Sequence, residues 1–183
     1  EDNFENEYWQ GTRYGSKNKP VEERVSALAV LSGLADKKHY EILVDSILLP
    51  VQKCSPHMEW IVEEAIMLTG QYDKGLLRMR QRHESQVNDK NLTTMYERFP
   101  NDPRGNLGTP NHAWNAPNYV LSRYIAGIKA TDVAWSKFEV KPNLAHLTHV
   151  KQIVPSVKGD IIKKKKKTAD NYSLDLISPD QTS

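Results

Sequence analysis

The sequence predicts an α+β protein in which an array of helices precedes a β-rich segment. Apolar residues recur at spacings of three and four from about Pro20 to Tyr124, as on one face of a helix. After Gly127 the pattern changes to short runs of β-branched residues separated by turn residues. The connections between the helices are short, with one exception. These observations indicate helical hairpins followed by a β-domain.

Five helices are expected, and most have recognisable ends. Pro20 suits the first turn of a helix that Gly33 ends, and Ser55 followed by Pro56 is typical of another helix start. The fourth helix should begin at Asp73 and fade into a polar segment at 84–90. The expected helices span about residues 20–33, 36–50, 55–70, 73–84 and 115–127.

Four short strands are expected after the helices, at residues 138–140, 150–154, 161–167 and 172–177. The third contains the lysine run 163–167. We interpret that run as the charged edge of an exposed sheet, because edge strands often carry lysines, and not as a nucleic-acid site. The chain stops soon after the last strand, so we expect the sheet to continue beyond it.

The expected architecture is an incomplete (α/α)6-type toroid of helical hairpins, in residues 1–128, followed by a partial antiparallel β-sandwich, in residues 129–183. Five helices are too few to close a toroid of six hairpins. An open toroid would leave apolar helix faces uncovered, which soluble monomers avoid. We therefore expect self-association.

Composition excludes several classes of function. The 25 basic and 23 acidic side chains leave a net charge of +2, which gives no electrostatic case for nucleic acid. No apolar run is long enough to span a membrane. Cys54 is the only cysteine, and the closest histidines, His146 and His149, lack further ligands at metal-binding spacing. Neither a metal nor another cofactor is expected.

The long connection, residues 88–114, contains the most informative residues. Glu97 lies beside Arg98 and between the aromatic residues Tyr96 and Phe99. His112 and Trp114 follow shortly after it. Aromatic rings, hydroxyl-binding Arg and His, and a carboxylate that handles a proton are typical of pyranose sites. Long loops in compact proteins are often functional, although a chance aromatic cluster on a surface loop would have the same local composition.

Other carboxylates are expected to be structural. Glu22 and Glu23 fall in the first turn of a helix, where the helix dipole favours negative charge. Glu59 falls in the first turn after Pro56, as a capping charge or a residue at the mouth of the barrel would, and we favour the capping charge. Glu63 and Glu64 are expected on a solvated helix face.

Five segments resemble, in order and spacing, the catalytic region of bacterial α-L-rhamnosidases of glycoside hydrolase family 78. The resemblance covers about residues 20–142, and the β-rich tail looks like the start of that family's C-terminal sandwich. It implies an (α/α)6 barrel enzyme that removes terminal α-linked rhamnose by inversion. The segments are residues 23–35, 55–59, 93–99, 112–114 and 124–128.

The resemblance also implies roles for individual residues. Glu97 would activate water, His112 would bind sugar hydroxyls, and Trp114 would form part of the sugar-facing wall. Tyr96 and Phe99 stand where the family often has tryptophan, so the aromatic faces remain but the indole donors are lost. Arg98 would either orient the Glu97 carboxylate or form a structural pair.

The family's general acid lies in an upstream acidic loop that has no counterpart in this chain. We therefore expect the chain to be the C-terminal half of a catalytic barrel plus part of the next domain, with little turnover of its own. The intact protein is expected to be periplasmic or secreted, with an exporting segment before Glu1.

Two other hypotheses remain open. One is a carbohydrate-binding helical domain without catalysis, which would not depend on Glu97. The other is a helical scaffold that binds a protein partner, although no fixed-period repeat relates the helix pairs. Convergence of Glu97, His112 and Trp114 on one concavity would exclude the scaffold.

Overall fold

The computed structural model describes residues 4–5, 8–9, 21–100, 102, 105–110, 116–167 and 171–180. The chain divides into two compact units, residues 1–117 and 118–183. The division falls near the predicted domain boundary at residue 128, which itself stays a prediction.

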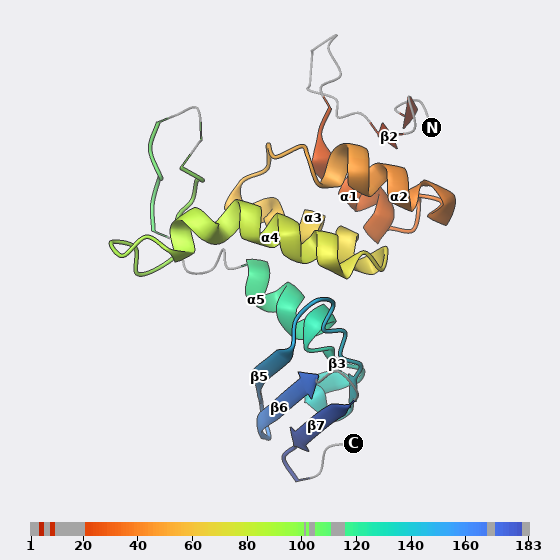
Figure 1. Cartoon of the computed structure of the whole chain (residues 1–183), viewed down its shortest axis with the longest axis vertical. Coiled ribbons are helices and arrows are strands. Elements are labelled where there is room, and N and C mark those ends of the chain that lie inside the picture. The colour runs from red at the N-terminus through yellow and green to blue at the C-terminus, as the bar shows by residue number, and fades with distance from the viewer. Residues whose placement is uncertain are drawn as a thin grey trace. The chain divides into compact units, whose positions relative to one another are not determined.

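The described part of the first unit contains two short paired strands, β1 (Phe4–Glu5) and β2 (Tyr8–Trp9), and then a series of helices. Helix α1 (Glu23–Leu31) follows Glu22, whose side chain accepts a hydrogen bond from the backbone N–H of Arg24. The next helical stretch is built from η1 (Lys37–His39), α2 (Tyr40–Leu43) and a π-helical turn, η2 (Val44–Leu48). It ends before Pro50, as expected. Figure 1 draws α1 and α2 in orange.

Two longer helices complete this unit. Helix α3 (Pro56–Leu68) begins with the expected Ser55-Pro56 pair. Helix α4 (Tyr72–Val87) is longer than predicted. The sequence pattern fails there because the last turns of α4 bury polar side chains, Arg82, His83 and Gln86, and not an apolar stripe.

The core of the first unit lies where α1, η2 and α3 pack together. Its buried side chains are mostly small or branched, and α1 packs closely against α3. The fully buried members include Ala27, Leu43, Val44, Leu48, Val62, Ala65 and Ile66.

Helix α5 (Ala116–Val120) crosses the division between the units. It continues in the second unit as a π-helical turn, η4 (Leu121–Ile125). A hairpin follows, in which β3 (Ile128–Ala130) pairs antiparallel with β4 (Phe138–Val140) around the short helix η5 (Val133–Trp135).

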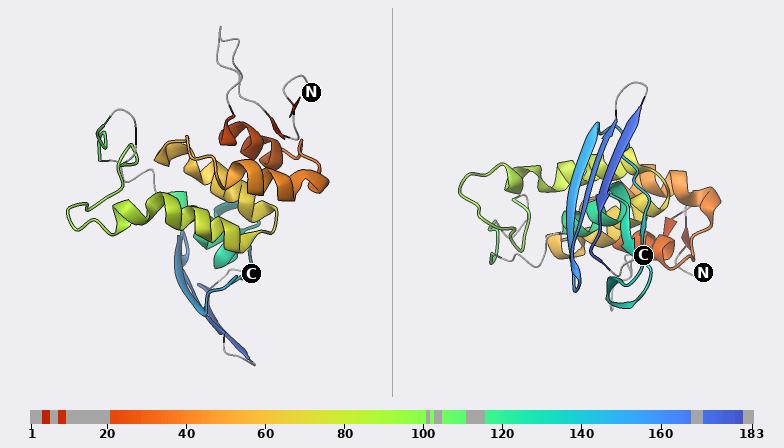
Figure 2. Two further views of the ribbon diagram at one scale, coloured as in Figure 1. Left: turned by 45° about the horizontal axis from the view of Figure 1, so that its top comes forward. Right: turned by 90° about the horizontal axis from the view of Figure 1, so that it is seen from below.

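The second unit also contains a three-stranded antiparallel sheet of β5 (His149–Ser156), β6 (Gly159–Lys167) and β7 (Tyr172–Ile177). The three strands form one curved sheet, drawn in blue (Figure 2). The strand order is β5-β6-β7. The lysine run therefore lies on the central strand, and the prediction that it marks a sheet edge was wrong.

The core of the second unit explains why one lysine of the run is not on an exposed edge. Ala126, Ile128, Val154 and Ile161 form a buried cluster against which Trp135 and Phe138 pack. Side chains alternate along a strand, so Lys163 follows Ile161 onto the same face. Lys163 is fully buried and donates a hydrogen bond from Nζ to the carbonyl oxygen of Ala126. One lysine of the run is thus an interior residue.

The α+β class is confirmed: apart from the short β1-β2 pair, which precedes α1, the longer helices come first and the antiparallel sheets follow them. Among the described residues, no helix combines the length and apolar character needed to cross a bilayer.

Burial lowers the pKa of Lys163 from 10.5 to about 8. The unfolded chain therefore binds more protons than the folded protein between about pH 8 and 10.5, and the folded protein gains stability as the pH rises through this window. Relative to Lys163→Met, the wild-type free energy of unfolding should rise by up to about 3 kcal/mol from pH 7.5 to 10.5. Urea denaturation at a series of pH values measures this change in the free energy of unfolding. The exposed neighbour provides the control: Lys164→Met should keep the wild-type pH dependence, and a Lys163→Met curve parallel to wild type would contradict the assignment.

Candidate functional site

The segment with Glu97 is held in a short ladder against residues 107–110. The backbone N–H of Glu97 donates to the carbonyl of Thr109 at 3.0 Å, and that of Arg98 donates to the carbonyl of Leu107 at 2.9 Å. Tyr96 and Pro110 form an antiparallel bridge at the end of the ladder. The predicted motif therefore lies on a loop with its own hydrogen-bonded structure.

The side chain of Glu97 contacts Thr109 of this ladder and remains 31% exposed. Its Oε2 accepts long hydrogen bonds from the backbone N–H and the hydroxyl of Thr109, both at 3.4 Å. A guanidinium nitrogen of Arg98 lies 3.8 Å from Oε1 and thus forms an ion pair longer than a hydrogen bond. A second guanidinium nitrogen of Arg98 donates to Asn106. These weak contacts orient the carboxylate and leave it accessible.

Gly108 makes room for this carboxylate. A Cβ atom at position 108 would lie 2.5 Å from Oε2 of Glu97, and the backbone φ there is +73°. Both the close approach and the left-handed conformation favour glycine. Any larger residue would displace the carboxylate or the loop.

Helix α4 holds the other side of the segment. Gln86 accepts a hydrogen bond from the N–H of Tyr96 and donates one to the carbonyl of Arg98. The ring of Phe99 is 5% exposed, with the Arg82 guanidinium 3.9 Å above its centroid and His83 edge-on at 5.4 Å. Phe99 therefore packs the loop onto α4.

Arg82 is itself fixed by a buried ion-pair network. Glu59 accepts from Arg78 at 2.5 Å and from Arg82 at 3.1 Å, and the Cys54 thiol donates to it at 2.7 Å. Burial alone would raise the pKa of Glu59, but the two guanidinium groups outweigh it and hold the pKa below its usual value. Glu23 accepts from two backbone N–H groups, those of Lys53 and Cys54.

Three expectations about carboxylates were wrong. Glu59 is fully buried and pairs with arginines of α4, so it is not a capping charge. Glu63 and Glu64 are also buried and do not form a solvated face. Glu63 contacts Nε2 of His83 at 3.2 Å, and burial raises the pKa of Glu63 despite this partner. Hydrophobic periodicity cannot find such residues because it treats every carboxylate as exposed.

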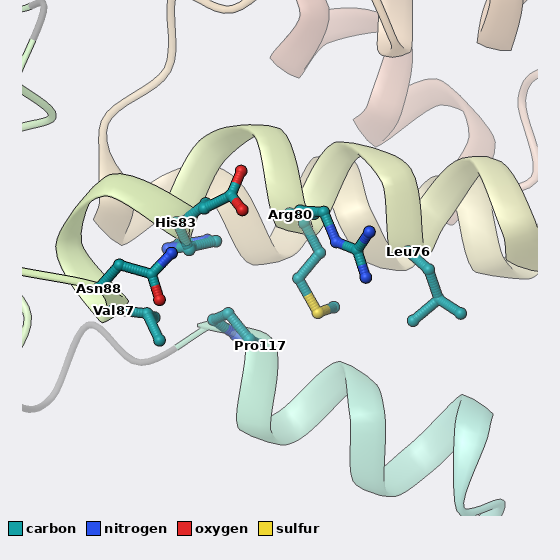
Figure 3. Close-up of a pocket in the computed structure, with 8 residues that line it drawn as sticks. Leu76, Arg80, His83, Val87, Asn88 and Pro117 are labelled. Carbon is teal, nitrogen blue, oxygen red and sulfur yellow. The ribbon is translucent and has the colours of Figure 1, made fainter. Parts of the chain in front are cut away.

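A hollow of about 350 Å³ lies beside α4 within the first unit. Figure 3 shows Leu76, Arg80, His83 and Val87 along α4, with Pro117 opposite. Glu97 does not line it. Among the described residues, no group of three or more His, Cys, Asp or Glu side chains could hold a metal ion.

The structure describes four of the six predicted site residues: Tyr96, Glu97, Arg98 and Phe99. His112 and Trp114 lie outside the described residues, so their convergence with Glu97 stays a prediction. The sequence reasoning missed Gln86, Gly108 and Thr109, which contact the motif or its backbone. The glycine-rich loop around Gly108 gave a weak signal, whereas Gln86 lies in a segment that was read only as polar.

Comparisons with known proteins agree on the fold. No family model matches the sequence, and no curated protein matches it. A family GH78 rhamnosidase of Bacillus sp. GL1 superposes with a TM-score of 0.77 and 21% identity over 96% of this chain and 20% of its own. The α-L-rhamnosidase of Streptomyces avermitilis, solved with L-rhamnose, superposes with a TM-score of 0.66 and 17% identity, over 91% of this chain and 18% of its own. The α-L-rhamnosidase of Dictyoglumus thermophilum superposes with a TM-score of 0.64 and 15% identity, over 88% of this chain and 20% of its own.

The predicted resemblance to α-L-rhamnosidases is thus confirmed at the level of fold. The chain spans about a fifth of the length of each of these solved structures. At these identities the likeness establishes the fold alone.

Gly108→Ala should destabilise the protein and displace the Glu97 carboxylate, because the new methyl group would occupy its place. Gly105 provides a matched control, since its φ is +72° and a Cβ there would meet nothing within 4 Å. Both variants should lose about 1–2 kcal/mol of unfolding free energy from backbone strain, and Gly108→Ala should lose more. In NMR spectra only Gly108→Ala should shift the amides of Glu97 and Thr109. Equal losses and equal shifts would contradict this arrangement.

Proposed function

We propose that this chain is part of a glycoside hydrolase that removes terminal α-linked L-rhamnose, or a related pyranose, with inversion. Glu97 activates the attacking water. The observation that carries the proposal is the Glu97 side chain, which is 31% exposed on a segment whose backbone is bonded on both sides. The shared fold with three α-L-rhamnosidases supports the substrate class.

The proposed chemistry divides the work between two carboxyl groups. In inverting glycosidases they stand about 6.5–9.5 Å apart, which leaves room for water between the base and the anomeric carbon. Glu97 takes a proton from that water as the water oxygen bonds to the anomeric carbon. A carboxylic acid, which we place outside this chain, protonates the leaving oxygen as the glycosidic bond breaks.

The aromatic residues of the motif divide into two roles. Tyr96 is half-buried at the end of the ladder, and we assign its ring to the sugar-facing side. Phe99 is almost fully buried under Arg82, so we assign it to positioning and no longer to sugar contact. His112 and Trp114 keep their proposed roles in binding hydroxyls and forming the wall.

The remaining architecture follows from the same proposal. In the intact protein the helices of the first unit would form part of an (α/α)6 toroid, and the sheets of the second unit would belong to a β-sandwich. If the chain exists alone, we expect it to self-associate through helix faces that the rest of the toroid would cover.

Glu97→Gln in the intact protein should lower kcat about 10²–10⁴-fold, because the amide cannot accept the proton of water. Kinetics on an aryl α-L-rhamnoside measures this, and NMR of the first product should show the β anomer. Glu41→Gln, at an exposed glutamate of α2, is the control and should leave kcat unchanged.

Unchanged turnover in Glu97→Gln would refute the role of Glu97. An intact wild-type protein that binds L-rhamnose without hydrolysing any α-L-rhamnoside would favour the non-catalytic carbohydrate-binding domain. A protein that neither binds nor hydrolyses the sugar would favour the scaffold.

A further inference from the structure

Gln86 contacts the backbone on both sides of Glu97. Its Oε1 accepts a hydrogen bond from the N–H of Tyr96 at 3.1 Å, and its Nε2 donates one to the carbonyl of Arg98 at 3.0 Å. The residue is only 3% exposed. The Gln86 side chain therefore fixes the backbone at Tyr96 and at Arg98, and Glu97 lies between these two residues.

A primary amide is suited to this task because it offers an acceptor and donors side by side, as a peptide group does. Gln86 thus gives the segment the bonds that a neighbouring strand would give it. The opposite edge of the segment is bonded to Leu107 and Thr109. With both edges bonded, the backbone at residue 97 has little freedom to shift.

The position of Gln86 is fixed by the helix that carries it. Arg82, His83 and Gln86 lie within one turn of α4 and share a face. Arg82 binds the Glu59 carboxylate at 3.1 Å and the Cys54 carbonyl at 2.6 Å. These buried bonds hold the last turns of α4, so the loop takes its position from a rigid part of the protein.

No hydrogen bond joins Gln86 to the Glu97 carboxylate, which accepts, among the described residues, from the N–H and hydroxyl of Thr109. Gln86 therefore acts on the backbone that carries the carboxylate. Displacement of a reacting group by about 1 Å can cost on the order of 10²-fold in rate. We propose that Gln86 is a positioning residue that holds Glu97 in register with the attacking water. This proposal rests on the function proposed above for Glu97.

A double-mutant cycle in the intact protein tests it. Leucine is close to glutamine in size and makes no hydrogen bonds, so Gln86→Leu should lower kcat about 10–100-fold and leave KM within about twofold. In a Glu97→Ala background the same change should alter kcat less than about twofold, because the group to be positioned is gone. Gln81→Leu is the matched control: Gln81 is an exposed residue of α4, and its replacement should leave both constants unchanged.

Amide hydrogen exchange gives a readout independent of turnover. Gln86→Leu should speed exchange at Tyr96 and leave the amides of α4 unchanged. Gln86→Glu keeps the acceptor for Tyr96 and loses the donor to Arg98, so it should speed amide exchange at Tyr96 less than Gln86→Leu does. It replaces the leucine variant in these experiments if that variant does not fold.

Two results would overturn the proposal. One is an equal loss of kcat from Gln86→Leu in both backgrounds, which would indicate a general loss of folded protein. The other is unchanged exchange at Tyr96. Unchanged kcat in Glu97→Ala alone is a separate outcome, because it removes the proposed function before Gln86 is considered.

Discussion

The buried pairing of Glu59 with Arg78 and Arg82 is the interaction on which the rest of the first unit depends. It joins α3 to α4 inside the protein, where water cannot replace a lost partner. Removing one member of such a network costs about 3–5 kcal/mol, because the remaining charge stays buried without a counterion. The network thus links the position of α4 to that of α3, since each buried charge needs its partner. Arg82, one of its members, lies in the half of α4 that leads into the long loop.

Helix α4 connects this network to the candidate site, because its side chains contact both. Arg82 lies between the Glu59 carboxylate on one side and the ring of Phe99 on the other. Gln86, one turn further along, binds the backbone next to Glu97. The backbone of residues 96–98 is therefore bonded on both edges. The contacts of the Glu97 carboxylate with other described residues are long, and its side chain stays partly exposed. A base that activates water needs this combination, since it must be held in place and still meet its substrate.

The sequence predicted the elements better than it predicted their environments. Helix starts such as Ser55-Pro56 and the β-branched runs were found because they depend on local chemistry. The interior roles of Glu59, Glu63 and Lys163 were missed, because their burial depends on partners far along the chain. The motif around Glu97 was recognised from its residue types, but Gln86 was not, since a glutamine in a polar segment carries no local sign of what it binds.

The most direct test of the central claim is a crystal structure of the intact protein with L-rhamnose bound. We predict that residues 96–98 keep their bonds to Gln86, and that a Glu97 oxygen lies within hydrogen-bond distance of a water facing the anomeric carbon. A sugar bound where Glu97 points away from it, or a loop released from Gln86 when the sugar binds, would contradict the claim.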